Sequence, residues 1–431
     1  MNRSSNAAVD TLLAKMRANI TSQQPALHRV APGESGNLTE SPEYAMLKGL
    51  RARYQEGNGL INPYFRARSG DVAATLQMAG RDYISFSNYN YLGLANDPRV
   101  KHAVHEAVDR YGCHAGAARM VGGEIELHAQ LETELARFIG CEAATVSVSG
   151  YSANVTVIGY LLDRRDLILH DEYMHNSGLM GAVMSGARRI AFPHNDMVAL
   201  EALLKEHRDG YRRVLILVEG AYSMDGDLVD LPQVVALKKR HNAWLMIDEA
   251  HSCGTVGATG RGVCEHFGIA PAEVDLIVGT LSKSFASCGG FVAGKKEWID
   301  LLHHFCPGLQ LYSTGISPAN TAAALAALRV TCAEPQRVAR LQSNARHFVE
   351  QARQRGFECG SAVPGVPIVP LMIDDDRALR LMSRLLDHGV IAHAVMHPVV
   401  PHNEARLRCF ISSEHDEAMI AHTLDLLTQP L

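Results

Sequence analysis

Three short stretches of the sequence combine reactive side chains with segments that would present them. An apolar run, Trp244–Ile247, is followed at once by Asp248 and, three residues later, by His251. A second apolar run leads to Lys283, which stands between serine side chains. The stretch 147–154 places small residues directly before an expected helix. Each stretch alone has an ordinary structural explanation, namely a helix cap, a common Ser-Lys pair or a plain glycine turn.

Taken together, the three stretches supply the parts that pyridoxal 5′-phosphate (PLP) requires. Backbone N–H groups at a helix start, at Gly150 and Tyr151, can hold a phosphate. Asp248 can keep a pyridine nitrogen protonated, so that the ring withdraws electrons. Lys283 can hold the aldehyde as a Schiff base and act as a base once an amino acid displaces it. The sequence therefore predicts PLP as the cofactor. To act as a base near neutral pH, Lys283 would need its pKa lowered by burial and by the cationic ring.

The elements that must position these residues predict a mostly parallel sheet. Short apolar runs of strand length alternate with helical stretches through the middle of the chain, which is typical of βαβ units. Ligands of such sheets bind at the carboxyl ends of the strands, where all three stretches lie. The expected strands are 144–148, 166–170, 188–191, 214–218, 244–247 and 276–278, and the expected helices include 98–111, 127–139, 197–207 and 231–241.

We divide the chain into three parts: an N-terminal arm and helix (1–75), a large domain (76–318) and a smaller C-terminal α/β domain (319–431). The arm has a short helix candidate at 10–18 and a helix at 43–55, which Ser41 and Pro42 would start. Two short strands, 73–78 and 83–86, follow. The C-terminal part has expected helices at 319–332, 335–356, 377–388 and 414–427 and expected strands at 368–373, 391–395 and 407–411.

Composition excludes several classes of protein. The chain has 431 residues and a formal net charge of −5, which argues against a general nucleic-acid binder. Nine cysteines without a CxxC pair suggest reduced thiols rather than disulfides, and give no metal-ligand spacing. The N-terminal residues lack the apolar core of a signal peptide, and no apolar run approaches the ~20 residues of a membrane helix. We expect a cytoplasmic protein with no membrane span.

Seven motifs, in order and at matching spacing, resemble those of the PLP-dependent α-oxoamine synthase family. The resemblance covers the chain from about residue 60 to its end and is greatest to serine palmitoyltransferases and their polyketide-pathway relatives. The motifs are YNYLGL (89–94), SGYSAN (149–154), EGAYSMDGD (219–227), DEAHS (248–252), GRG (260–262), GTLSKS (279–284) and ARLR (405–408). The resemblance implies the fold-type I PLP-dependent transferase fold, a large mostly parallel sheet domain with a smaller α/β domain.

The resemblance also implies roles around the cofactor. Lys283 would form the Schiff base and remove the Cα proton, and Asp248 would pair with the pyridine nitrogen. His251 would bond the ring hydroxyl, and His175 would stack on the ring face. The remaining cofactor residues would be Ser223 near the ring, Gly150, Tyr151, Thr280 and Ser282 at the phosphate, and Ser313 and Thr314 at the phosphate of the neighbouring subunit of a homodimer.

The implied reaction joins an α-amino acid to an acyl thioester, carried by coenzyme A or an acyl carrier protein, with loss of CO2, and gives an α-amino ketone. Arg408, helped by Asn90, would bind the amino-acid carboxylate through its planar guanidinium fork. Ala118 stands where relatives carry Ser or Thr, and we expect it to leave room for an amino acid larger than glycine.

Two alternatives remain at this point. An aminotransferase on the same fold would share Asp248 and Lys283, but not the His175, Ser223 and 405–408 set. A non-catalytic subunit would be expected to lack the lysine, and a PLP-fold transcription factor would need an added helix-turn-helix that the first 40 residues do not offer.

Overall fold

The structure is a computed structural model that describes residues 37–54, 60–397, 400 and 403–430. The helix candidate at 10–18 lies outside the described residues. Contacts divide the chain into two units, Met1–Leu60 and Ile61–Leu431, and we describe each by itself. In the first unit, the Ser41 side chain caps helix α2 (Pro42–Arg53) by accepting the N–H of Tyr44 at 3.2 Å, as the sequence predicts. A short 3₁₀ turn, Leu38–Glu40, precedes this helix.

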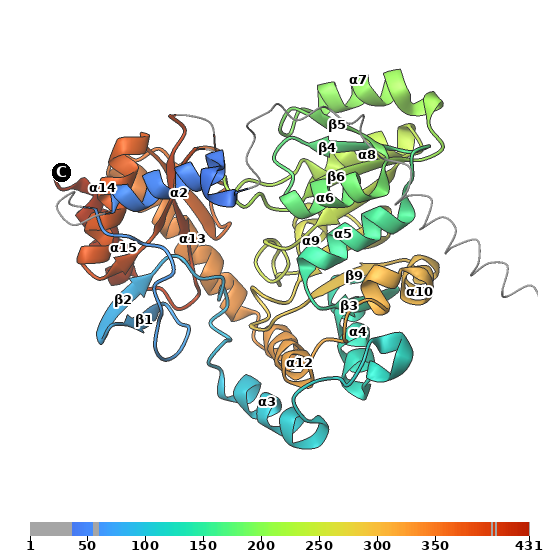
Figure 1. Cartoon of the computed structure of the whole chain (residues 1–431), viewed down its shortest axis with the longest axis horizontal. Helices are drawn as coiled ribbons and strands as arrows, with labels where there is room; N and C mark the ends of the chain where they lie inside the picture. The colour runs from blue at the N-terminus through green and yellow to red at the C-terminus, as the bar shows by residue number, and fades with distance from the viewer. Residues whose placement is uncertain (1–36, 55–59, 398–399, 401–402, 431) are drawn as a thin grey trace, which may run out of the picture. The chain divides into compact units, whose positions relative to one another are not determined.

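A seven-stranded sheet forms the centre of the second unit, in the order β3-β9-β8-β7-β6-β4-β5 (Figure 1). All of its strands run parallel except β9, which lies antiparallel between β3 and β8. The mostly parallel sheet of the prediction is therefore confirmed. The strands are β3 (Ala143–Ser147), β4 (Leu167–Asp171), β5 (Arg188–Phe192), β6 (Val214–Glu219), β7 (Trp244–Asp248), β8 (Leu276–Thr280) and β9 (Gly290–Gly294).

Strand β9 is absent from the sequence prediction. Its short apolar core is enclosed by glycines, a pattern that is also typical of a loop. The first of these glycines, Gly290, is needed because a Cβ there would lie 2.4 Å from the backbone nitrogen of Gly150. Only a residue without a side chain lets this strand pass so close to the helix that follows β3.

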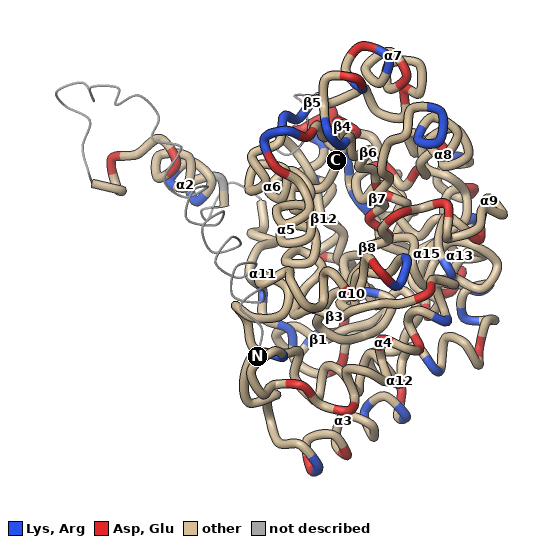
Figure 2. The backbone as a smooth tube through the Cα atoms, turned by 90° about the vertical axis from the view of Figure 1, so that its right-hand side faces the viewer, with Lys and Arg blue, Asp and Glu red and all other residues tan. Residues whose placement is uncertain are grey.

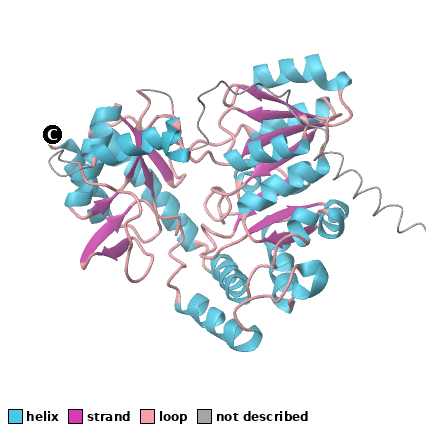
Figure 3. Cartoon of the chain, viewed as in Figure 1, coloured by secondary structure: helices cyan, strands magenta, loops and turns pink. Residues whose placement is uncertain are grey.

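Alternate residues of each strand pack on opposite faces of the sheet, as the two-residue period requires. Leu217 and Val278 pack with helices α5, α6 and α10 on one face, whereas Ile216 and Ile277 pack in the larger core with α4, α8 and α12. Figure 3 shows helices on both sides of the strands. The helices are α3 (Pro98–Tyr111), α4 (Glu126–Ile139), α5 (Gly150–Leu161), α6 (Asn176–Ser185), α7 (Met197–His207), α8 (Leu231–Arg240), α9 (Val263–Phe267), α10 (Lys296–Phe305), α11 (Pro307–Gln310) and α12 (Pro318–Ala333).

Two three-stranded sheets lie outside the central one. One is antiparallel, in the order β10-β13-β12, and the other joins β1 and β2 to β11. The prediction of a single strand at 391–395 is therefore wrong. The strand is interrupted at Ala392, and the segments before and after Ala392 belong to different sheets. The elements are β1 (Thr75–Met78), β2 (Arg81–Ser85), α13 (Gln336–Gln354), β10 (Ile368–Met372), α14 (Asp375–Asp387), β11 (Val390–Ile391), β12 (His393–Val395), β13 (Arg406–Phe410) and α15 (Glu417–Thr428).

The pairing of β2 with β11 joins the start of the second unit to its C-terminal third, because Ile84 pairs with Val390. The three-part division of the chain stays a prediction. Acidic and basic residues are interspersed along the backbone of the second unit (Figure 2). No helix among the described residues is long and apolar enough to cross a membrane.

Candidate active site

The carboxyl ends of neighbouring strands bring the predicted chemistry to one edge of the central sheet. Glu219 at the end of β6 lies opposite Asp248 at the end of β7, and Asp248 lies opposite Val278 of β8. Lys283 follows β8 by three residues. The parallel register thus places a carboxylate and an amine from separate parts of the sequence at adjacent strand ends.

Asp248 is held from several elements. Its side chain is buried, and its Oδ2 accepts a hydrogen bond from the Asn154 amide of α5 at 2.6 Å. Its Oδ1 accepts the backbone N–H of Ala250 at 2.9 Å. Asn154 also donates to the Ser177 hydroxyl at 2.9 Å, while its own Oδ1 is buried without a partner among the described residues. The carboxylate is therefore held in one orientation, with an unused polar atom beside it.

The side-chain amine of Lys283 has no ion-pair partner among the described residues. Its Nζ makes no hydrogen bond or ion pair with a described residue and lies 5.4 Å from the centre of the Tyr89 ring. Burial lowers the pKa of Lys283 from 10.5 to about 8, against the opposing attraction of Asp248 and Glu219. A lysine in this state supplies free amine near neutral pH, which imine chemistry and proton removal both require.

Two histidines flank this centre in different states. His251 is buried, and its Nδ1 lies 2.8 Å from the Tyr91 hydroxyl. Burial, reinforced by the charge of Lys283, holds the pKa of His251 well below 6.5, so the ring is neutral. His175 caps α6, its Nδ1 lies 2.7 Å from the Ser177 hydroxyl, and its backbone N–H donates to Glu219 at 2.6 Å. Its ring stays exposed at the strand ends, where it is free to contact a flat ligand.

The start of α5 forms a narrow anion cradle. Gly150 is the first residue of this 12-residue helix, and a Cβ on it would lie 3.1 Å from the Cβ of Thr280. The Thr280 hydroxyl donates to the carbonyl of Gly289 at 3.0 Å, and the Ser282 hydroxyl accepts the N–H of Gly289 at 3.2 Å. Helix N–H groups and two hydroxyls thus converge where the sequence predicts a phosphate site. Tyr151 is half-exposed on the first turn of the same helix.

Arg408 on β13 faces the loop that follows β6. Its Nη1 donates to the carbonyl of Ser223 at 3.1 Å, and its guanidinium lies 4.7 Å from the centre of the Phe410 ring. Its Nε is buried and has no hydrogen-bond partner among the described residues. An unused, buried guanidinium donor beside this edge is suited to a ligand carboxylate.

The remaining predicted residues lie in two other places. Asn90 is occupied with its own loop, since its Oδ1 accepts the N–H groups of Leu94 and Ala95 and its amide donates to a backbone carbonyl. Ala118 lies beside the segment that carries Ser313 and Thr314, because Gly315 donates to the carbonyl of Ala117 at 3.1 Å. The segments of Ala118, Ser313 and Thr314 thus lie side by side. Among the described residues, no hydrogen bond joins these three to Lys283 or Asp248.

Sequence reasoning assigned no role to Asn154, Ser177, Glu219 or Tyr91, although three of them lie inside or beside quoted motifs. Each makes a hydrogen bond to a partner more than 20 residues away, which no local pattern predicts. The signal that the sequence does offer is the motifs themselves, since they contain Tyr91, Asn154 and Glu219. With the carboxylate, amine, histidines and anion cradle, the described residues fit PLP.

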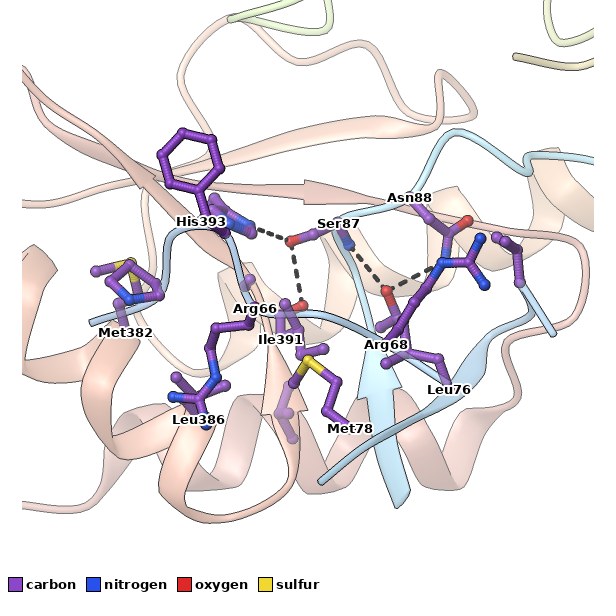
Figure 4. Close-up of a pocket in the computed structure, with 16 residues that line it drawn as sticks. Arg66, Arg68, Leu76, Met78, Ser87, Asn88, Met382, Leu386, Ile391 and His393 are labelled. Atoms are coloured by element: carbon purple, nitrogen blue, oxygen red, sulfur yellow. Dashed lines mark hydrogen bonds between the residues drawn. The ribbon is translucent and has the colours of Figure 1, made fainter. Parts of the chain in front are cut away.

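A cavity of about 290 Å³ is lined by residues of the 63–88 segment and of the 382–393 segment (Figure 4). Ser87 and His393 belong to its lining, and their side chains are 2.8 Å apart. His393 pairs with Arg408 across β12 and β13. Paired residues of neighbouring antiparallel strands point to the same face, so the cavity and the guanidinium share one side of this sheet. Apolar side chains line most of the cavity and two arginines stand at its rim: Leu76, Met78, Met382, Leu386, Ile391, Arg66 and Arg68.

Comparison with known proteins gives a consistent result. The aminotransferase class I and II family model matches residues 81–427. The chain is 39% identical to the 8-amino-7-oxononanoate synthase of Thermosipho melanesiensis, over 84% of this chain and 92% of that protein. It is 42% identical to the enzyme of the same name from Geobacter sulfurreducens, over 82% and 90%.

Solved structures of two serine palmitoyltransferases resemble the chain. That of S. paucimobilis, with a bound PLP–myriocin aldimine, superposes with a TM-score of 0.85 at 30% identity and covers 91% of this chain and 98% of that one. That of Sphingomonas wittichii gives a TM-score of 0.85 at 29% identity, over 91% and 97%. The relatives named in both comparisons belong to the α-oxoamine synthase family that the motifs quoted above resemble.

Proposed function

The chain belongs to the class I and II aminotransferase family, as a PLP-dependent α-oxoamine synthase, and we propose that Lys283, Asp248 and Arg408 carry its reaction. In this reaction an α-amino acid is condensed with an acyl thioester and CO2 is released. The observation that supports this most directly is the unpaired amine of Lys283, held near the fixed carboxylate of Asp248 at adjacent strand ends. When bound, PLP supplies an aldehyde and an electron-withdrawing ring that stabilises negative charge at Cα.

The chain's own residues divide the remaining work. Asp248, oriented by Asn154, holds a proton on the ring nitrogen, and neutral His251 bonds the ring hydroxyl. His175 covers one ring face, and the start of α5 binds the phosphate. Lys283 would hold the aldehyde, and its amine, once the amino acid has displaced it, would take the Cα proton of the amino acid. Asp248 and His251 are buried and Lys283 is partly buried, which limits access of water to the reacting carbon.

Arg408 orients the amino acid. Its unused Nε and the fork of its guanidinium would hold the carboxylate in two parallel hydrogen bonds until that group leaves as CO2. Ala118 leaves space for a side chain larger than hydrogen, so alanine or serine is the proposed amino acid. A panel of amino acids tests this: turnover of glycine alone would contradict it.

The cavity shown in Figure 4 is the proposed site of the acyl chain. At the ~30 Å³ share of one water-sized group, its 290 Å³ holds about ten such groups. Two methionines in the lining can adapt to chains of different shape. Arg66 and Arg68 bond only backbone carbonyls among the described residues, so their charge is available to a carboxylate or phosphate on the donor.

We further propose a cytoplasmic homodimer with shared active sites. In such a dimer the joined segments of Ala118, Ser313 and Thr314 would complete the site of the partner subunit. The hydrogen bond from Gly315 to Ala117 joins these segments, and no bond among the described residues ties either of them to Lys283, which supports this arrangement. Measuring the mass of the purified protein in solution tests the dimer, and complementation between two inactive variants tests the sharing of sites.

A substrate matrix is the decisive experiment. Amino acids are combined with acyl-CoA esters of several lengths and with acyl carrier proteins, and both thiol release and CO2 are measured. We expect the two products in equal amounts, only with PLP, and none from Lys283→Ala. Amino transfer to a keto acid without CO2 would instead identify an aminotransferase, and failure to bind PLP would refute the proposal.

A further inference from the structure

His194 lies between two buried carboxylates. Its Nδ1 is 2.9 Å from Asp171 at the end of β4, and its Nε2 is 2.7 Å from Asp227 in the loop after β6. A carboxylate can only accept, so both ring nitrogens must donate and the ring is an imidazolium. The ring is also stacked on Tyr173 at 4.4 Å and meets Tyr222 edge-on at 4.5 Å. The cation is thus held in one orientation by contacts on every side.

The charges around His194 support this state. Asp171 is fully buried and Asp227 nearly so, and the neighbouring Asp225 is paired with Arg406. Burial alone would lower the pKa of His194, but the hydrogen bonds to the two carboxylates outweigh it and raise the pKa to about 10. The cation therefore persists over the pH range in which an enzyme of this kind would work.

The two carboxylates belong to segments that carry site residues. Asp171 precedes His175 by four residues, and its carbonyl accepts the N–H of Met174 at 3.0 Å. Asp227 closes the turn of residues 222–227, because its carbonyl accepts the N–H of Tyr222 at 3.0 Å. The carbonyl that receives Arg408, that of Ser223, lies inside this turn.

We propose that His194 is a positioning residue, which locks the segment of His175 to the turn that receives Arg408 and so sets the distance between the ring-face histidine and the carboxylate-binding arginine. This inference rests on the roles proposed above for those two residues. Asn195 reinforces the lock, since its backbone N–H donates to Asp171 at 3.0 Å and its amide to Asp227 at 3.2 Å. Without the imidazolium, the two segments would carry facing negative charges with no cation between them, and such charges repel in a buried setting.

Two variants separate the lock from general folding. His194→Phe keeps the ring contacts and removes both donors. Asp227→Asn keeps the bond of His194 to Asp171 and weakens the bonds that His194 and Asn195 make to residue 227. His207→Phe at the end of α7 is the matched control. His207 is also largely buried, but among the residues that the structure describes its one ion pair is with Glu206. Hydrogen–deuterium exchange of the cofactor-free protein should show faster exchange in 171–177 and 220–228 together in both lock variants, and in neither segment in the control.

The holoenzyme gives the second readout. In both lock variants we expect kcat/KM for the amino acid to fall about 10- to 100-fold, mainly through KM, since displacement of about 1 Å has this scale of effect. The visible circular dichroism of bound PLP should change as well, because the ring-face histidine shifts. A purely structural role would lower the yield of folded enzyme without moving KM or the dichroism of the folded fraction.

The outcomes are distinguishable. If His194→Phe does not fold, Asp227→Asn decides alone, and an unchanged KM and dichroism in that variant would overturn the proposal. Arg408→Ala is measured in parallel. If it leaves the KM for the amino acid unchanged, the proposed role of Arg408 fails; if it raises KM while the lock variants do not, the lock fails and the proposed function stands.

Discussion

The state of the Lys283 amine in the cofactor-free protein can be tested directly. With a pKa of about 8, about a tenth of the amine is neutral at pH 7; with the ordinary 10.5, about 0.03% would be. Lys283 should therefore react about 300-fold faster at pH 7 than an ordinary lysine of equal access. The assay is brief treatment with acetic anhydride between pH 6 and 11, followed by proteolysis and mass spectrometry of the Lys283 peptide.

The charges around Lys283 predict how its reactivity should shift. Asp248→Asn removes an attraction that raises the pKa of Lys283, so labelling should reach half its maximum below pH 8; Arg408→Gln removes a repulsion and should move the midpoint up. Lys296 is the internal control, because its ion pair with Asp300 raises its pKa. A midpoint for Lys283 near 10.5, or an upward shift in Asp248→Asn, would refute the reasoning.

Three further predictions concern binding and stability. Arg408→Lys keeps the charge but not the planar fork, so kcat/KM for the amino acid should fall about 10- to 100-fold, the scale of a charge-assisted bond; an unchanged value in steady-state kinetics would argue against carboxylate binding. Replacing Arg66 and Arg68 together by Gln should raise KM for acyl donors that carry a free carboxylate or phosphate near the chain, whereas Arg81→Gln, outside the cavity, should not; equal effects of the two changes would count against the cavity. The pKa of His194 is raised on folding, from 6.5 to about 10, so its stabilisation is complete below pH 6.5 and is lost as the pH rises through 10. After discounting for solvent screening, we expect this stabilisation to be about 2 kcal/mol at pH 7. Urea unfolding at pH 7 and pH 10 measures it, and an equal loss for His194→Phe at both pH values would contradict the assignment.

Much of the central sheet is readable from local patterns. The helix expected at 98–111 has those bounds in the structure, because Asp97 caps it, Pro98 starts it and Gly112 ends it. The apolar runs that end at Asp248 and before Lys283 are strands for an equally local reason, since a strand buried on both faces must be apolar throughout. The alignment of both residues at one edge follows from the parallel connection of successive units.

The strands that the sequence did not predict correctly depend on partner strands that are distant in the chain. The glycine-bounded β9 is a strand because β3 and β8 supply its hydrogen bonds on both sides. The expected strand is interrupted at Ala392 because its first half pairs with β2 and its second half pairs with β13. Local strand propensity does not predict either pairing, since the partner strands lie far away in the chain.

The sequence by itself determined the kind of chemistry: an acid after one buried strand, a lysine after another and a small-residue turn before a helix suffice to predict PLP. The tertiary structure decided how those groups are held. The Asn154 bond to Asp248, the lowered pKa of Lys283 and the bridge of His194 between Asp171 and Asp227 arise only when separate strand ends meet. The physical reason is that residue types and short spacings specify which reactions are available, whereas burial and charge balance depend on neighbours that only folding supplies.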